Sequence, residues 1–143
     1  MIMKVLLVDD EAPFVEALAK RLDKRGVTVT AAFSGSEALE KLQADSRVDV
    51  VVLDVKMPGM DGVETLKAIK ATYPLIEVVM LTGHATVESA IEGMKLGALD
   101  YLMKPCEMEV LMTKLSEAKE KKARQEGKIA EARAMNIALR RGD

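Results

Sequence analysis

The chain has 143 residues, a length typical of one domain, and hydrophobic residues make up 49% of it, which is enough for a buried core. Charged residues of both signs make up 31%, and the formal net charge of -2 argues against a protein whose whole surface binds nucleic acid. The single cysteine, Cys106, excludes an internal disulfide. No apolar stretch approaches the roughly 20 residues of a membrane span, and no signal-peptide pattern is present. We therefore expect a soluble cytoplasmic protein with no membrane association.

Five short apolar runs predict β-strands at residues 3–8, 27–32, 48–53, 76–81 and 99–103. Three of the runs (KVLLV, VDVVVL and IEVVML) are almost continuously apolar, as expected of parallel strands that are buried on both faces. The run VTVTAA alternates between apolar and polar residues instead, which predicts a half-exposed edge strand.

Segments of helical periodicity separate the predicted strands. Val15, Leu18 and Leu22 line one face of the first segment, and Ser34 followed by Glu37 is a capping box that opens the second. The resulting alternation, βαβαβαβαβα with right-handed crossovers, predicts an α/β fold in which helices cover both faces of a doubly wound five-stranded parallel sheet.

The composition changes from about residue 114, where Lys, Glu, Ala and Arg become frequent. This pattern predicts a fifth helix that continues past the domain, with a domain over residues 1–122 and a charged helical extension over residues 123–143. Gly127 disfavours one unbroken helix. The gap between Ala118 and Ile129 interrupts a heptad pattern, so a coiled-coil dimer is only weakly signalled. Charges of mixed sign predict a solvated face and no direct binding of nucleic acid.

Polar side chains follow four of the predicted strands, at the edge where functional groups of doubly wound folds gather. Asp9, Asp10 and Glu11 follow the first strand, Asp54 the third, Thr82 the fourth and Lys104 the fifth. If these four strands are neighbours, the carboxylates, the hydroxyl and the ammonium meet in one shallow pocket.

Carboxylates that lie close together repel one another and need a cation, and hard oxygen ligands suit Mg²⁺. A carboxylate can also act as a nucleophile and form an aspartyl phosphate, whose charge a metal, a lysine and a hydroxyl would balance. Taken singly, each aspartate has a plainer interpretation as a helix or turn cap, and the lysine as a solvated side chain. Their coincidence at four strand ends favours the functional interpretation.

The segments LLVDDE, VVLDVKMPGMDG, VVMLTGHA and ALDYLMKP resemble the conserved blocks of two-component response regulator receiver domains, in the family's order and spacing. The resemblance covers about residues 3–120 and is closest to receivers of the nitrogen-regulator, enhancer-binding class. It implies a flavodoxin-like fold with strand order 2-1-3-4-5, Mg²⁺ as cofactor and a sensor histidine kinase as partner. It also implies a signalling domain that catalyses only its own phosphorylation and dephosphorylation. No G-x-x-x-x-G-K-[ST] loop occurs, so the chain is either a stand-alone receiver or one piece of a longer protein.

The resemblance also assigns roles at the pocket. It implies that Asp54 is both the phosphoacceptor and a metal ligand, that Asp10 binds Mg²⁺ directly and Asp9 through water, and that the backbone carbonyl of Lys56 is a further metal ligand. Lys104 would pair with Asp54 and later with the phosphoryl group, across a cis bond to Pro105.

Switching and tuning roles follow from the same resemblance. Thr82 would move to meet a phosphoryl oxygen and Tyr101 would turn inward with it. The fourth helix, the fifth strand and the fifth helix would then change shape to control a partner or a homodimer, for which the C-terminal helix is an alternative interface. We hypothesise that Lys56 and His84 set the lifetime of the phosphorylated state. Gly83 would leave space for the phosphodonor, or is a simple turn glycine.

Three other classes of protein remain as alternatives. A haloacid-dehalogenase-like phosphatase needs D-x-D-x-T/V after the first strand, which DDEAP does not supply. A flavodoxin-like nucleotide binder needs a phosphate loop rich in Gly, Ser or Thr, whereas the first loop here is acidic. A pseudo-receiver that acts only as a scaffold would not need the intact set of acidic, hydroxyl and lysine residues.

Overall fold

Five parallel strands form one sheet in the order β2-β1-β3-β4-β5. The structure is a computed structural model in which residues 2–57, 59–83 and 86–141 are described. The strands are β1 (Met3–Val8), β2 (Val27–Ala32), β3 (Val50–Leu53), β4 (Glu77–Thr82) and β5 (Asp100–Met103). The predicted strand order and the edge position of β2 are therefore confirmed.

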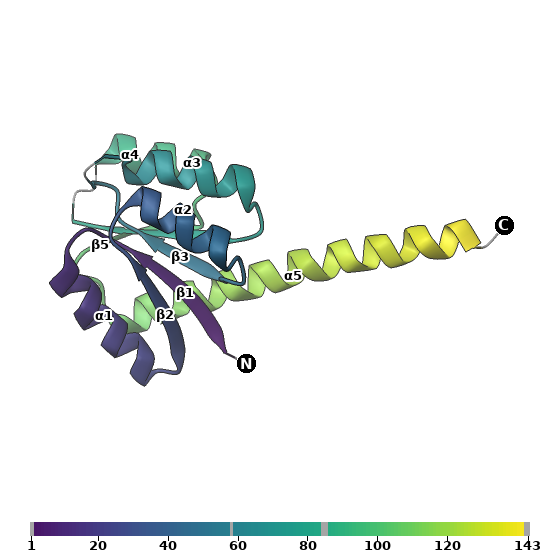
Figure 1. Ribbon diagram of the computed structural model, residues 1–143, viewed down its shortest axis with the longest axis horizontal. Helices are drawn as coiled ribbons and strands as arrows, with labels where there is room; N and C mark the ends of the chain where they lie inside the picture. Colours follow the sequence, from purple (N-terminus) through teal and green to yellow (C-terminus); the bar gives the residue numbers. More distant parts are fainter. Residues whose placement is uncertain (1, 58, 84–85, 142–143) are drawn as a thin grey trace.

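Helices cover both faces of this sheet (Figure 1). They are α1 (Ala12–Lys24), α2 (Gly35–Ala44), α3 (Gly62–Thr72), α4 (Val87–Lys95) and α5 (Met108–Arg141). One core cluster joins α1 and α5 to the sheet, and the other joins α2 and α3 to its opposite face, where α4 also lies. This three-layer arrangement confirms the predicted doubly wound α/β fold.

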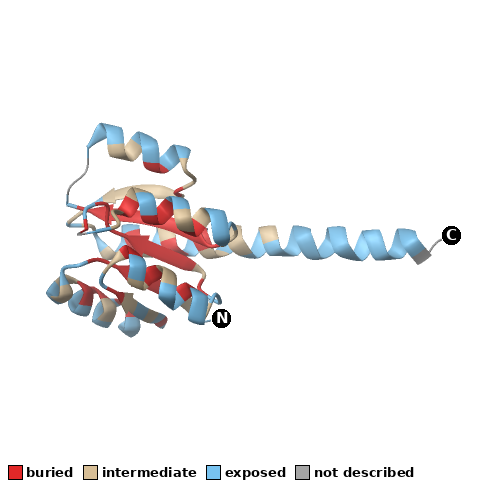
Figure 2. Ribbon diagram, turned by 45° about the horizontal axis from the view of Figure 1, so that its top comes forward, coloured by how far each residue is buried: buried red, intermediate tan, exposed pale blue. Residues whose placement is uncertain are grey.

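Burial follows the sequence pattern of the strands. All residues of β3 and β4 are buried, as are the last four of β1, because both of their faces lie under helices. Strand β2 is only partly buried, as an edge strand is: Thr28 and Thr30 are exposed, whereas Val27 and Ala32 at its two ends are buried. Figure 2 shows the buried residues concentrated in the central strands and on the inward faces of the helices. The sheet thus gives a rigid base to the loops at its carboxyl edge.

Side chains that cap the N-termini of three helices fix the residues at which these helices begin. Ser34 accepts a hydrogen bond from the Glu37 N–H at 3.1 Å, as the sequence predicted, and Asp61 accepts one from the Glu64 N–H at 2.8 Å. In α4, Thr86 and Ser89 form a reciprocal capping box. Helices α3 and α4 therefore begin at fixed positions beside the carboxyl edge of the sheet.

Gly62, the first residue of α3, lies directly against the backbone that follows β3. A β-carbon at this position would be 2.6 Å from the Cα of Val55 and 2.9 Å from the carbonyl carbon of Asp54, closer than real contacts allow. We expect Gly62→Ala to lower the free energy of unfolding by about 1–3 kcal/mol, because backbone must shift to admit the methyl group. Urea denaturation measures the change.

Gly127→Ala is the matched control, because a β-carbon there would meet nothing within 4 Å. In the middle of a helix this substitution should raise stability by about 0.5–1 kcal/mol. Equal losses in the two variants would contradict the steric explanation for Gly62.

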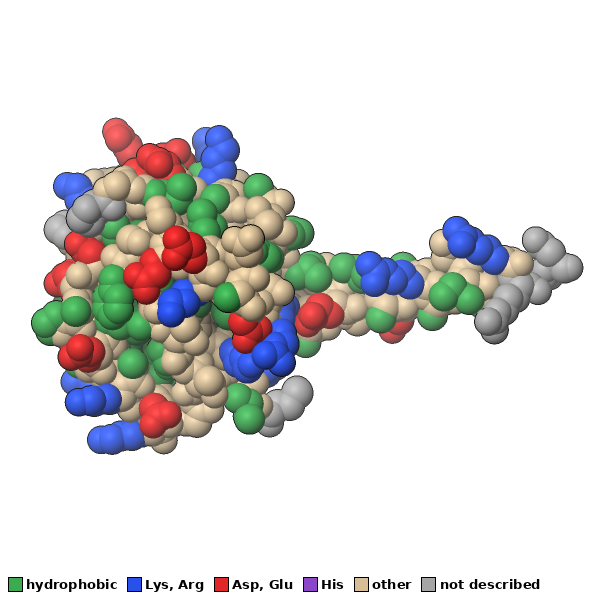
Figure 3. Space-filling view, in the orientation of Figure 1, with side chains coloured by type: hydrophobic (Ala, Val, Ile, Leu, Met, Phe, Trp, Pro, Cys, Tyr) green, Lys and Arg blue, Asp and Glu red, His purple; other side chains and the backbone are tan. Residues whose placement is uncertain are grey.

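Helix α5 continues far beyond the body of the domain as a solvent-exposed rod (Figure 1). Gly127 does not interrupt it, contrary to the expectation that a glycine disfavours one continuous helix. Where α5 leaves the body, Lys119 and Lys122 lie 3.3 and 3.6 Å from the Asp49 carboxylate, and Lys121 lies 3.4 Å from Glu77. Figure 3 shows basic, acidic and hydrophobic side chains interleaved along the rod. The domain division at residue 122 stays a prediction.

Apolar side chains are exposed on α4 and β5. Val87, Ile91 and Met94 of α4 are 77%, 51% and 47% exposed, and Met103 of β5 is 54% exposed. By contrast, Met108 and Met112 of α5 pack against the core. Among the described residues, no helix combines the length and the apolar character that a bilayer crossing requires.

Candidate functional site

The β1–β3 pairing brings two buried aspartates together at the carboxyl edge of the sheet. Val8 pairs with Leu53, and the Asp54 N–H donates to the Val8 carbonyl at 3.0 Å, so Asp9 and Asp54 leave the two strands side by side. Asp9 is 1% exposed and Asp54 is 2% exposed. Two carboxylates at this depth need a compensating charge.

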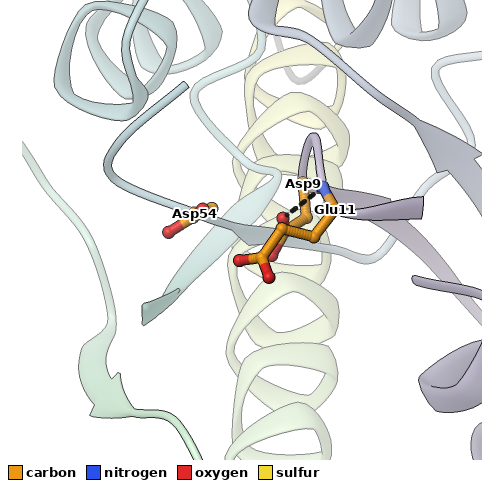
Figure 4. Close-up of side chains that lie close together, drawn as sticks. All are labelled: Asp9, Glu11 and Asp54. Carbon is orange, nitrogen blue, oxygen red and sulfur yellow. Dashed lines mark hydrogen bonds between the residues drawn. The ribbon is translucent and has the colours of Figure 1, made fainter. Parts of the chain in front are cut away.

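Glu11 joins these aspartates in one acidic group. Carboxylate oxygens of Asp9, Glu11 and Asp54 all lie within 4.8 Å of one another (Figure 4). The Glu11 N–H donates to Asp9 Oδ1 at 2.9 Å, and the Val55 N–H donates to Asp54 Oδ1 at 2.8 Å. These backbone hydrogen bonds orient the two buried carboxylates and leave one oxygen of each facing the group.

Lys104 supplies the positive charge, from the loop after β5. Its side chain is 13% exposed, and its Nζ lies 2.6 Å from Asp9 Oδ2, 3.1 Å from Glu11 Oε1 and 4.0 Å from Asp54 Oδ2. Nζ also lies 4.0 Å from the centre of the Phe14 ring, a cation–π contact. The Lys104–Pro105 peptide bond is cis, as the family resemblance implied.

Burial, hydrogen bonds and neighbouring charges together set the pKa values of Asp9 and Lys104. Burial raises the pKa of Asp9, the charge of Asp54 adds to the rise, and hydrogen bonds from Lys104 and from the Glu11 N–H only partly offset it. For Lys104, burial lowers the pKa, but the hydrogen bonds to Asp9 and Glu11 outweigh it and the pKa is raised. Lys104 therefore stays an ammonium at neutral pH.

The remaining oxygen of Asp54 fits a bound cation. Among the described residues, Asp54 Oδ2 is fully buried and has no hydrogen-bond partner. Three carboxylates share a single lysine within this group, which leaves an excess of negative charge. An uncompensated oxygen beside other carboxylates suits a hard divalent ion.

Thr82 and Tyr101 lie on the neighbouring strands β4 and β5. Thr82 ends β4 fully buried, and its carbonyl accepts a hydrogen bond from the Lys104 N–H at 2.9 Å. The Tyr101 hydroxyl lies 2.9 Å from the hydroxyl of Ser89, the residue that completes the α4 capping box. Tyr101 therefore links β5 to the N-terminus of α4 in this conformation.

The other predicted site residues lie outside the acidic group. Asp10 is exposed and its carboxylate is not a member of the group described above, so its role as a direct metal ligand stays a prediction. Lys56 is exposed. Gly83 is exposed, and a β-carbon there would meet nothing within 4 Å. His84 lies outside the described residues, so its tuning role also stays a prediction.

The sequence placed Glu11 at this strand end but gave it no role, whereas the structure brings its carboxylate into the group and leaves that of Asp10 outside it. The signal was present, because the loop after β1 reads DDE and carries three consecutive carboxylates. Which of the three turn inward depends on the path of the loop into α1, and strand-end position alone does not fix that path.

Comparison with known proteins identifies the family of this domain. The family model for the response regulator receiver domain matches residues 5–116. The transcriptional regulatory protein ZraR of Klebsiella oxytoca is 42% identical over 114 residues, which are 80% of this chain and 26% of that protein. The DNA-binding transcriptional regulator NtrC of Escherichia coli K12 is 38% identical over 105 residues, 73% of this chain and 22% of that protein. This chain thus spans about a quarter of the length of these two relatives.

Solved structures share the fold. A receiver domain protein from Clostridium thermocellum has a TM-score of 0.81 and 34% identity, with 85% of this chain and 97% of that chain covered. The receiver domain of NtrX from Brucella abortus has a TM-score of 0.76 and 31% identity, with 81% and 98% covered. Both similarities extend over nearly the whole of the compared domain.

Proposed function

The chain belongs to the response regulator receiver domain family of two-component systems, and on that premise we propose that it accepts a phosphoryl group on Asp54 from a sensor histidine kinase. The observation that carries the proposal is the buried Asp54 Oδ2, which has no hydrogen-bond partner among the described residues and lies 4.0 Å from the Lys104 ammonium. A carboxylate oxygen that is neither hydrogen-bonded nor exposed to bulk water is a suitable nucleophile.

Phosphoryl transfer needs few additional groups. An Asp54 oxygen forms a bond to phosphorus while the bond from phosphorus to the imidazole nitrogen of the kinase breaks, and the nitrogen keeps the electron pair and takes up a proton. Lys104 is close enough to approach the transferred group and to balance its charge. The chain catalyses only its own phosphorylation and the hydrolysis that reverses it.

Mg²⁺ is the cofactor that best fits the acidic group. Asp9 and Asp54 would hold it, together with Asp10 and the Lys56 carbonyl if these adopt the positions implied by the family. When bound, the ion would neutralise the carboxylates and the incoming phosphoryl oxygens. The chain's own contribution is to fix the carboxylates on two adjacent strands.

The signal would leave the domain through the face of α4, β5 and α5. Phosphorylation would draw Lys104 and Thr82 toward Asp54, and Tyr101 would exchange its contact with Ser89 for an inward position. The exposed apolar residues of α4 would then meet a partner or a second copy of the chain, for which α5 is the alternative interface. We expect no direct contact with nucleic acid or with membranes.

The test is phosphorylation of the purified chain by acetyl phosphate in the presence of Mg²⁺. We expect intact mass spectrometry to detect one phosphoryl group that hydroxylamine removes, and borohydride reduction to locate it at Asp54. A parallel sample in which a chelator replaces Mg²⁺ should stay unmodified. A stable modification, or one located at another residue, would contradict the proposal.

A further inference from the structure

We propose that Glu11 and Phe14 are positioning residues that hold Lys104 beside Asp9 in the unphosphorylated chain and thereby keep it away from Asp54. The inference deepens the proposed function and rests on it. It concerns which groups control the lysine before the phosphoryl group arrives.

The distances show that Lys104 is held to one side of the acidic group. Its ammonium carries three N–H donors, and two carboxylates lie within hydrogen-bond range, Asp9 at 2.6 Å and Glu11 at 3.1 Å. Asp54, at 4.0 Å, lies beyond that range. The lysine is thus bound by the two carboxylates of the first loop and only attracted by the phosphoacceptor.

Phe14 is a further group in contact with the lysine ammonium. Its ring belongs to the first turn of α1, packs against the core and lies 4.0 Å from the Lys104 ammonium. A cation over an aromatic face is attracted without being neutralised. The ring therefore favours the same position of Nζ as Glu11 does, and it does so without competing for a hydrogen bond.

Glu11 has the properties of a partner that can release the lysine. Its side chain is 58% exposed, whereas that of Asp9 is 2% exposed, so Glu11 can return to water when Lys104 moves. A phosphoryl dianion on Asp54 would attract the ammonium more strongly than one exposed carboxylate does. Glu11 then sets how readily the lysine leaves its resting position.

A different role for Glu11 gives the opposite expectation. Its carboxylate also lies in the group that fits a divalent ion. If Glu11 mainly binds the ion, loss of its charge weakens Mg²⁺ binding and slows phosphorylation. If it mainly holds Lys104, the same change releases the lysine and speeds phosphorylation.

The experiment compares Glu11→Gln and Phe14→Leu with Glu16→Gln, an equal loss of charge at an exposed position of α1. Solvent exchange of the Lys104 ammonium protons, followed by NMR without metal, should become about threefold faster in both test variants. Calorimetric Mg²⁺ affinity should change less than about twofold in Glu11→Gln. The rate of transfer from acetyl phosphate, in which acetate leaves with the electron pair, should rise about threefold in that variant. The control should change none of these.

Three results would overturn the inference. They are unchanged ammonium exchange in Glu11→Gln, an unchanged transfer rate, and Mg²⁺ binding weakened more than about fivefold together with slower transfer. If Phe14→Leu fails to fold, Glu11→Gln alone decides. If the wild-type chain takes no phosphoryl group on Asp54, the proposed function fails separately, and ammonium exchange still shows whether Glu11 holds the lysine.

Discussion

Replacement of Asp54 by Asn is expected to abolish phosphoryl incorporation and, in Mg²⁺-free buffer, to raise the free energy of unfolding by roughly 0.5–2 kcal/mol. The amide is not a nucleophile, so no acyl phosphate can form. It is nearly the same size as the carboxylate, and its oxygen can still accept the hydrogen bond from the Val55 N–H. What the change removes is a buried negative charge that lies beside Asp9 and Glu11.

The pH dependence of stability gives this prediction a second signature. The pKa of Asp9 is raised above 3.8 by burial and, in addition, by the charge of Asp54. The folded chain therefore holds a proton on Asp9 more tightly than the unfolded chain does, and stability falls as pH rises from about 3.8 through the raised pKa. In Asp54→Asn the pKa of Asp9 should be lower than in the wild-type chain. The decrease in stability with rising pH should therefore end at a lower pH in this variant.

Urea denaturation at several pH values, with a chelator present, measures both effects. Asp23→Asn is the matched control, because Asp23 is exposed near the C-terminal end of α1, whereas Glu11 of the acidic group precedes the N-terminus of that helix. It should leave phosphorylation intact and change the free energy of unfolding by less than about 0.5 kcal/mol. A loss of stability in Asp54→Asn would show that the charge of Asp54 is compensated in the folded chain, contrary to our account.

The sequence predicted the fold well because its signals are local and repeated. Apolar runs marked β1 and β2 to the residue, and they marked the other strands to within one or two residues of where they begin and end. The alternating pattern of β2 identified it as an edge strand. Strand order was less accessible, since no local pattern states which strands are neighbours, and it came from resemblance to a family.

From the sequence, only the site residues that directly follow a strand could be predicted. Asp9, Asp54 and Lys104 could be predicted in this way, because each comes directly after a strand whose position the sheet fixes. Position at a strand end does not predict the contacts of Glu11 and Phe14 with Lys104, which depend on where α1 begins. Contacts between residues more than 90 positions apart, such as the one between Glu11 and Lys104, have no signature in a single sequence.

The continuity of α5 shows the limit of intrinsic propensity. Glycine costs a helix interior about 1 kcal/mol relative to alanine, which made a break at Gly127 a reasonable expectation. The residues on both sides are strong helix formers, and lysines on the preceding turns anchor the helix to Asp49 and Glu77. Propagation from an anchored helix needs no new nucleus, so one glycine is tolerated.

Mg²⁺ is expected to stabilise the wild-type chain strongly and specifically. An ion that binds only the folded state at 100 times its dissociation constant raises the free energy of unfolding by about 2.7 kcal/mol. The folded chain offers such a site because Asp9 and Asp54 are held side by side by β1 and β3. The unfolded chain has no comparable arrangement, since these residues are distant in sequence. Urea denaturation with and without Mg²⁺, at equal ionic strength, measures the difference.

Asp9→Asn and Asp54→Asn should each remove most of this stabilisation, whereas Asp23→Asn should retain all of it. The two site variants differ in one informative respect. Asp9 is the nearest partner of Lys104, at 2.6 Å, so in the metal-free chain the loss of Asp9 should raise the stability less than the loss of Asp54 does. A smaller gain for Asp9→Asn than for Asp54→Asn without the ion, together with equal losses of Mg²⁺ stabilisation, would identify Asp9 as both a metal ligand and the partner that neutralises Lys104. Equal stabilisation of all variants by Mg²⁺ would instead mean that the ion acts through general screening and that this acidic group does not bind it.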